Sequence, residues 1–170
     1  MANCYFTLNG QPHSRFVYDG VSSTAFSGHG PDRNNPGSGA VPNNGPTPPG
    51  SYWIVDRQSG GLLGGLRDWI TDRDEWFALY RDDGSIDDET FYDSVRRGQF
   101  RLHPLGPLRM SIGCIVLEYA SEFSTLSSYL RAQPVSYIPG TKTRTFGTVA
   151  VAQQILDDRV PRRGPPSAWA

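Results

Sequence analysis

Cys114 and His103 are the two residues whose chemistry has to be explained first. His103 stands at the end of a predicted strand, and Cys114 comes eleven residues later, after a connection that contains Pro104, Gly106 and Pro107. If the strands on either side of this connection pair as neighbours, the imidazole can reach the thiol. A thiol with a pKa of about 8.5 is only a few per cent thiolate near pH 7, and an adjacent imidazolium lowers that pKa. The pair therefore indicates a nucleophilic cysteine with its base.

The segment around Cys114 also fits acyl transfer. Gly113 permits close approach of the backbone, so the amides of Gly113 and Cys114 could face a developing oxyanion. A third group should orient the imidazole, and either Ser111 or a backbone carbonyl could do so.

Two other interpretations of Cys114 stay open on spacing alone. Free cysteine is among the most buried residue types, so Cys114 could be an inert core residue. It could also form a disulfide with Cys4, although the start of the chain has no basic region followed by an apolar core, and we expect no signal peptide. Two cysteines and three scattered histidines make a poor ligand set, so we expect no metal and no cofactor.

Two separated motifs carry a resemblance to a known family. One is His103-Pro104 with Ser111–Ile115 (SIGCI), and the other is Phe26–Gly28 (FSG) with Thr47–Ile54 (TPPGSYWI). They resemble the L,D-transpeptidase (YkuD-type) cysteine enzymes, which carry a histidine, a short spacer and Ser/Thr-His-Gly-Cys. Upstream, those enzymes carry Ser-Thr-Gly, a loop and Thr-Pro-x-Gly-x-(aromatic)-x-Ile. The resemblance covers roughly Tyr5–Ala132.

The sequence departs from the motif of this family at three points, and these departures indicate a particular subfamily. Ile112 replaces the histidine before Gly-Cys, Val116 stands where an arginine usually follows, and the spacing from histidine to cysteine is shorter. Together with the expected absence of a signal peptide, these features resemble the type VI secretion L,D-transpeptidase effectors. Those proteins are antibacterial toxins that are delivered into the periplasm of a rival cell.

The resemblance implies a peptidoglycan-modifying cysteine enzyme, an L,D-carboxypeptidase or L,D-transpeptidase. It would remove or exchange the terminal D-alanine of tetrapeptide stems through a thioester, with Cys114, His103, Ser111 and Gly113 as the catalytic set. It also implies D-amino acids as acceptors, a cognate immunity protein, the type VI secretion apparatus as a partner, and synthesis in the cytoplasm before delivery to the periplasm. The alternatives are a catalytically inactive wall-binding module and a cysteine amidase or peptidase of another fold.

Four further residues are candidates for substrate binding. Arg109, between the histidine and the cysteine, could pair with a carboxylate of the stem peptide or be a solvated loop residue. Arg101 should share a strand face with the candidate base, where it could border the site or form a structural ion pair. His29 could supply a polar contact, although a loop histidine is more often simply exposed. Tyr52 and Trp53 alternate on a strand, so one should be core and the other could border the substrate, with Tyr52 as our candidate.

Composition excludes several function classes. A chain of 170 residues, 37% of them hydrophobic, is the size of one ordinary domain. Its formal net charge of −1 argues against a generic binder of nucleic acid or of anionic membranes. No stretch approaches the roughly 20 apolar residues that span a bilayer, and no phosphate-binding glycine motif follows a predicted strand.

The elements that must position these residues are mostly strands. The pattern predicts short strands in residues 1–27, a loop over 28–50, strands that start near 51, 76, 100, 111 and 143, and helices over 87–97 and 121–132, with an ambiguous helix at 66–70. Ser121 should cap the helix over 121–132. We expect a mainly β or α+β fold, an L,D-transpeptidase-like β-sandwich with one or two short helices. It would form a single catalytic domain over 1–158, with a tail over 159–170.

Overall fold

Regular alternation along the first strand begins the sheet. The structure is a computed structural model that describes residues 1–56 and 76–154. In β1 (Ala2–Leu8) every second side chain is buried, and those between are exposed or half-exposed. This is the pattern of a strand with one face on the core and one face outside. The prediction of short strands in the first 27 residues is confirmed.

The other elements of the described residues follow in chain order. The strands are β2 (Ser14–Tyr18), β3 (Val21–Ser27), β4 (Gly50–Asp56), β5 (Phe77–Arg81), β6 (Glu89–Tyr92), β7 (Val95–Gly98), β8 (Arg101–Pro104), β9 (Ile115–Leu117), β10 (Ser136–Tyr137) and β11 (Arg144–Gln153). The helix α1 (Ala120–Arg131) lies between β9 and β10. Two short 3-10 turns, η1 (Gly30–Asp32) and η2 (Pro36–Ser38), interrupt the predicted loop between β3 and β4. The predicted mainly β class is confirmed.

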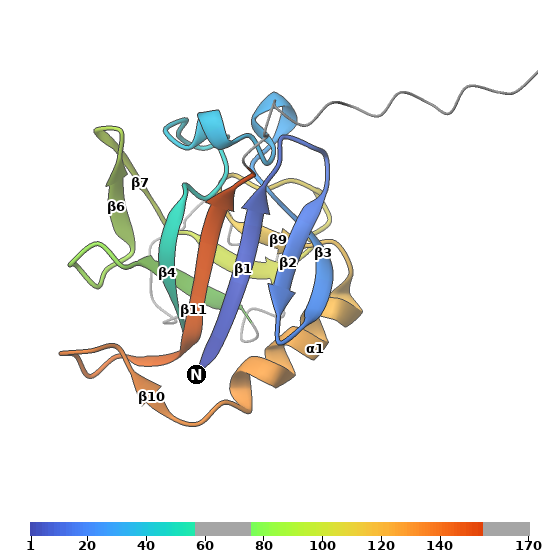
Figure 1. Cartoon of the computed structure of the whole chain (residues 1–170). Coiled ribbons are helices and arrows are strands. Elements are labelled where there is room, and N and C mark those ends of the chain that lie inside the picture. Colours follow the sequence, from blue (N-terminus) through green and yellow to red (C-terminus); the bar gives the residue numbers. More distant parts are fainter. Residues whose placement is uncertain (57–75, 155–170) are drawn as a thin grey trace, which may run out of the picture.

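The main sheet closes on itself. Its strand order is β1-β2-β3-β9-β8-β5-β4-β11-β10, and β1 also pairs in parallel with β11. Figure 1 shows β4, β11, β1 and β2 side by side, with β8 and β9 behind them. The structure therefore differs from the expected β-sandwich, because β1, at one end of this order, also pairs with β11, next to the short strand β10 at the other end. The result is one continuous, barrel-like sheet.

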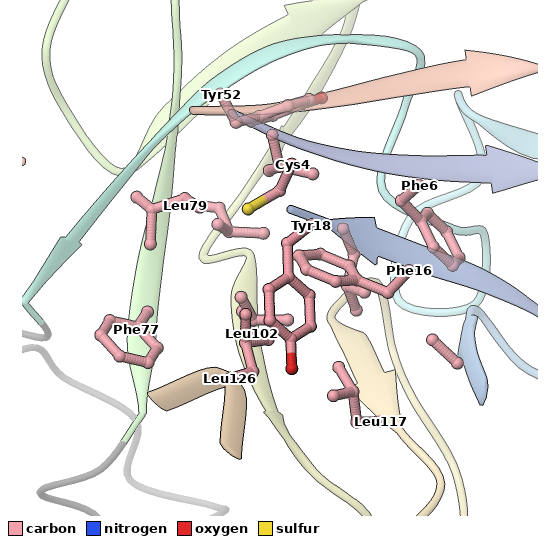
Figure 2. Close-up of a cluster of buried hydrophobic side chains, with 14 of the residues drawn as sticks. Cys4, Phe6, Phe16, Tyr18, Tyr52, Phe77, Leu79, Leu102, Leu117 and Leu126 are labelled. Carbon is pink, nitrogen blue, oxygen red and sulfur yellow. The ribbon is translucent and has the colours of Figure 1, made fainter. Parts of the chain in front are cut away.

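Apolar side chains from the strands fill the inside of this barrel. Figure 2 shows Cys4 pointing into the cluster together with Tyr18, Tyr52 and Leu79. Tyr52 is fully buried, and its hydroxyl donates a hydrogen bond of 2.8 Å to the carbonyl of Pro48. The prediction of Tyr52 as a substrate contact is therefore wrong, because the inward face of β4 packs this ring into the core.

The helix α1 covers one end of the barrel (Figure 1). Its position confirms the helix predicted over 121–132, and the predicted apolar face is buried, with Phe123, Leu126 and Leu130 in the core. The prediction that Ser121 caps the helix is wrong: the N-cap is Tyr119, whose side chain makes no capping bond.

The segment predicted as a helix over 87–97 is instead the β-hairpin of β6 and β7. Asp93 and Ser94, which connect the strands, both have a positive φ, 48° and 65°. This is the backbone of a tight hairpin turn and not of a helix. The opposite charges that suggested a helix dipole meet across the strands, where Arg96 and Glu89 form an exposed ion pair.

Two expectations lie outside the described residues, the ambiguous helix at 66–70 and the tail over 159–170. Within the described ranges, no helix is long and apolar enough to cross a membrane.

Candidate active site

Two adjacent parallel strands bring the predicted thiol and imidazole to one face of the barrel. In the β8–β9 pairing, Leu102 lies opposite Ile115, and both side chains are fully buried in the core. Because strand residues alternate, the flanking residues Arg101, His103 and Cys114 lie on the outer face. Neighbouring strands are about 4.8 Å apart. The pairing of neighbouring strands on which the His103–Cys114 hypothesis depends is therefore present.

A backbone carbonyl fixes the tautomer of the candidate base. The Nδ1 atom of His103 lies 2.7 Å from the carbonyl oxygen of Pro104. Since a carbonyl can only accept, Nδ1 carries the hydrogen, and Nε2 is the nitrogen that can take up a proton. The indole of Trp76 stacks on the imidazole, with ring centroids 4.1 Å apart and planes 13° from parallel. Stacking of this kind restricts the orientation of the imidazole ring.

Ser111 orders the turn before Cys114 and not the imidazole. Its hydroxyl donates a 2.7 Å hydrogen bond to the carbonyl of Cys114 and accepts one of 3.2 Å from the amide of Gly113. Of the two groups that could orient His103, the structure therefore places a backbone carbonyl there. The Gly113 amide, which we expected to face an oxyanion, is directed at the Ser111 hydroxyl instead.

Buried hydroxyls from the upstream motif hold the same turn from the other side. The carbonyl of Gly113 accepts hydrogen bonds from Thr47 Oγ1 at 2.5 Å and from Ser27 Oγ at 3.2 Å. The backbone of Ser27 in turn donates to the side-chain oxygen of Asn34 at 2.8 Å. The sequence motif contains Ser27 and Thr47, but only the structure reveals that they support the residue before Cys114.

Sequence reasoning missed Arg97, which connects the long loop to this turn. Its guanidinium is buried, donates to the carbonyls of Gly39, Gly45 and Pro46, and lies over the ring of Phe100. Burial lowers the pKa of Arg97. Among the described residues, no carboxylate forms an ion pair with it. Its signal in the sequence is weak, because it follows the exposed Arg96 with no change in residue type.

Arg101 forms the structural ion pair that was one of its two expected roles. Its guanidinium makes two hydrogen bonds, of 2.6 and 2.5 Å, to the carboxylate of Asp88. The Cys114 sulfur lies 4.0 Å from the carbonyl oxygen of Gln99, in the segment that joins β7 to β8. The candidate thiol therefore has a buried cation on its strand face and a carbonyl beside it.

Two predicted substrate contacts lie in exposed loops. The guanidinium of Arg109 forms an ion pair with Glu118 at 2.5 Å, and the Arg109 side chain is 70% exposed. His29 is also exposed, and its backbone amide donates to the carbonyl of Asn44 at 2.9 Å. Both stay predictions as substrate contacts.

The two cysteines occupy different environments. Cys4 is buried in the core, and burial raises the pKa of its thiol to about 12. Cys114 is half-buried, and no disulfide links these two residues of the described chain. Within the same residues, no group of three His, Cys, Asp or Glu side chains could hold a metal ion.

A thiol and an oriented imidazole on adjacent strands of a closed, mainly β sheet are the parts of a cysteine acyl-transfer site. The family model described as the Tlde1 domain matches residues 22–141, and the chain belongs to this family, the type VI secretion L,D-transpeptidase effectors. Membership implies a type VI effector with L,D-transpeptidase-like activity. No curated protein and no solved structure matches the chain.

Proposed function

We propose that this protein is a peptidoglycan-modifying cysteine enzyme that acts on the L,D bond of tetrapeptide stems. One observation carries the proposal: the imidazole of His103 is fixed through Nδ1 by the Pro104 carbonyl, on the strand that runs beside Cys114. Membership of the effector family supports peptidoglycan as the substrate.

In the first step, the Cys114 thiolate attacks the carbonyl carbon of the third stem residue. His103 Nε2 takes the thiol proton and later returns it to the amine of the departing D-alanine. A carbon–sulfur bond forms and the carbon–nitrogen bond of the L,D linkage breaks, which leaves a thioester. The Pro104 carbonyl stabilises the imidazolium through the proton on Nδ1 while this charge exists.

The oxyanion of this step needs a backbone donor close to the sulfur. The amide of Cys114 itself is our candidate, because the Gly113 amide is directed at Ser111. Ser111 contributes by holding the Cys114 carbonyl and so the orientation of the adjoining peptide units.

The acceptor that resolves the thioester decides the product. Water gives L,D-carboxypeptidase activity, a D-amino acid gives exchange of the terminal residue, and a second stem gives a cross-link. The effector family supports use of the type VI secretion apparatus and delivery into target cells. Action in the periplasm of the target, and protection of the producer by a cognate immunity protein, are parts of the same proposal.

Mass spectrometry of purified disaccharide-tetrapeptide tests the proposal. The protein is incubated with this substrate, with and without D-methionine, beside a Cys114→Ala variant. We expect loss or replacement of the terminal D-alanine with the parent protein and none with the variant. Cys4→Ala is the matched control and should keep turnover, because Cys4 lies in the core. An unchanged tetrapeptide with folded, reduced parent protein would contradict the proposal.

A further inference from the structure

The cation next to Cys114 is a buried guanidinium that forms an ion pair with Asp88. Arg101 lies one residue before Leu102, and Cys114 lies one residue before Ile115, the partner of Leu102 in the parallel β8–β9 pairing. The two side chains are therefore on neighbouring strands and on the same outer face. Only 8% of Arg101 is exposed, so its charge acts through a medium that screens less than water does.

The hydrogen bonds of this guanidinium leave it incompletely neutralised. Both terminal nitrogens of Arg101 donate to Asp88, and one of them also donates to the carbonyl of Phe100 at 2.8 Å. The Nε atom is buried and has no hydrogen-bond partner among the described residues. The side chain of Asp88 is 33% exposed, whereas that of Arg101 is 10% exposed. Water therefore screens the charge of the carboxylate more strongly than the charge of the guanidinium.

The base of the hairpin places an opposing group beside the sulfur. The Gln99 carbonyl, 4.0 Å from Cys114 Sγ, can accept a hydrogen bond from a thiol but repels a thiolate. The Gln99 amide donates to the Asp88 carbonyl at 2.8 Å, so the same segment carries the carboxylate that partners Arg101. Arg101 and the hairpin base therefore act on the sulfur in opposite directions.

We infer that Arg101 is a positioning residue that stabilises the Cys114 thiolate, and that Asp88 limits how strongly it does so. The inference rests on the proposed function, in which Cys114 is the nucleophile. It assigns Arg101 to the charge state of the sulfur and not to contact with the stem peptide.

Several titratable or charged groups lie near Arg101 and Cys114. Those on the packed elements are His103 on β8, Tyr80 on β5, Arg97 on β7, and Asp88 before β6. Burial opposes the charge of Arg101, yet the hydrogen bond and the charge of Asp88, with a smaller contribution from Cys114, raise the pKa of Arg101 overall. Arg101 thus stays charged at any pH at which the thiol titrates.

The rate of alkylation of Cys114 by iodoacetamide as a function of pH tests the inference. Only the thiolate reacts, so the midpoint of the profile reports the thiol pKa. Peptide mass spectrometry separates Cys114 from Cys4. The variants are Arg101→Gln, Arg101→Lys and Asp88→Asn, and Arg96→Gln is the matched control because Arg96 is exposed and pairs with Glu89.

Arg101→Gln removes the cation, and we expect its midpoint to rise by about one pH unit. Asp88→Asn keeps an acceptor oxygen but removes the anion, so its midpoint should fall. The midpoint of Arg101→Lys should lie closer to that of the parent protein than the midpoint of Arg101→Gln does. The midpoint of Arg96→Gln should equal that of the parent. A common shift in the same direction for Arg101→Gln and Asp88→Asn, or no shift in either, would overturn the inference.

This test does not depend on the substrate. Opposite shifts in the alkylation midpoint, together with no turnover of tetrapeptide, would support the role of Arg101 and contradict the proposed function. Turnover of tetrapeptide with unshifted alkylation midpoints would support the proposed function and contradict the role of Arg101. Circular dichroism of each variant shows whether it is folded. If Arg101→Gln does not fold, the alkylation midpoint of Asp88→Asn still tests the inference.

Discussion

Gly113 holds the candidate nucleophile in place through its carbonyl. Its φ of 132° belongs to the region that favours glycine, and an added Cβ would lie 3.3 Å from Arg97. The carbonyl that precedes Cys114 receives two hydroxyl hydrogen bonds from the Ser27 and Thr47 pair. At the scale of single residues, the position of the sulfur therefore depends on side chains far from it in the sequence.

Thr47→Val should lower turnover because it removes the shorter of these two bonds without changing side-chain size. A hydrogen bond of this kind contributes about 1 kcal/mol, which corresponds to roughly a fivefold loss in kcat if it acts on the transition state. Steady-state kinetics on tetrapeptide would measure this loss. Thr125→Val, in the exposed face of α1, is the matched control and should leave kcat unchanged. Equal kcat in parent and Thr47→Val would contradict the prediction.

The two thiols should differ sharply in reactivity at pH 8. Burial raises the pKa of Cys4 to about 12, so about one Cys4 in ten thousand is thiolate at that pH. We expect iodoacetamide to modify Cys114 in the folded protein and to leave Cys4 intact, with peptide mass spectrometry as the readout. In urea both should react. Modification of Cys4 at the rate of Cys114 without denaturant would show that the core is open.

At the scale of elements, the β6–β7 hairpin connects the long loop to the active-site face. Arg97 of β7 donates to three loop carbonyls and lies over Phe100. Asp88 and Gln99, at the two ends of the hairpin, lie beside Arg101 and Cys114. The hairpin projects from the side of the barrel in Figure 1, yet its base contributes to the site.

Arg97→Lys should loosen this connection although it keeps the charge. An ammonium cannot reproduce the fork of donors that reaches Gly39, Gly45 and Pro46 together. We expect kcat to fall several-fold and Tm to fall by several degrees, since buried carbonyls lose partners. Kinetics and thermal denaturation would measure both. Arg96→Lys, on the exposed side of the same strand, should change neither, and a matching loss there would argue against a specific role of Arg97.

The sequence predicted most elements but not this connection. Strands such as β1, β5 and β11 follow from short local runs of apolar and β-branched or aromatic residues, and α1 follows from its apolar face. The hairpin was mistaken for a helix because its charges fit a helix dipole equally well, and the turn at Asp93 and Ser94 has no glycine. The partners of Arg97 and Arg101 depend on which distant segments meet, and no local pattern contains that information.

At the scale of the whole molecule, closure of the sheet depends on the β1–β11 pairing. The register places Ala2 opposite Gly147, and the two backbones approach closely there. A Cβ on Gly147 would lie 2.1 Å from the carbonyl oxygen of Ala2. The sequence predicts both strands, but their parallel pairing could not be predicted because it joins two segments that are far apart in the described chain.

Gly147→Ala should therefore destabilise the protein more than a glycine substitution in open space. The contact is with backbone, which cannot rotate away, so we expect a loss of at least about 2 kcal/mol in the free energy of unfolding. Urea denaturation followed by circular dichroism would measure it. Gly106→Ala is the matched control, because nothing lies within 4 Å of its added Cβ. Equal unfolding midpoints for the two variants would refute the argument from closure.

The pairing of β1 with β11 also affects how the protein folds during synthesis. β1 is synthesised long before β11, the sheet cannot close until β11 is present, and such distant pairings fold slowly. A nascent chain that has emerged as far as β9 already carries His103 and Cys114, although its sheet is still open. We expect ribosome-stalled chains that end before residue 144 to be digested by a protease that the released protein resists. The residues of the candidate site are therefore present in the growing chain before the sheet that positions them can close.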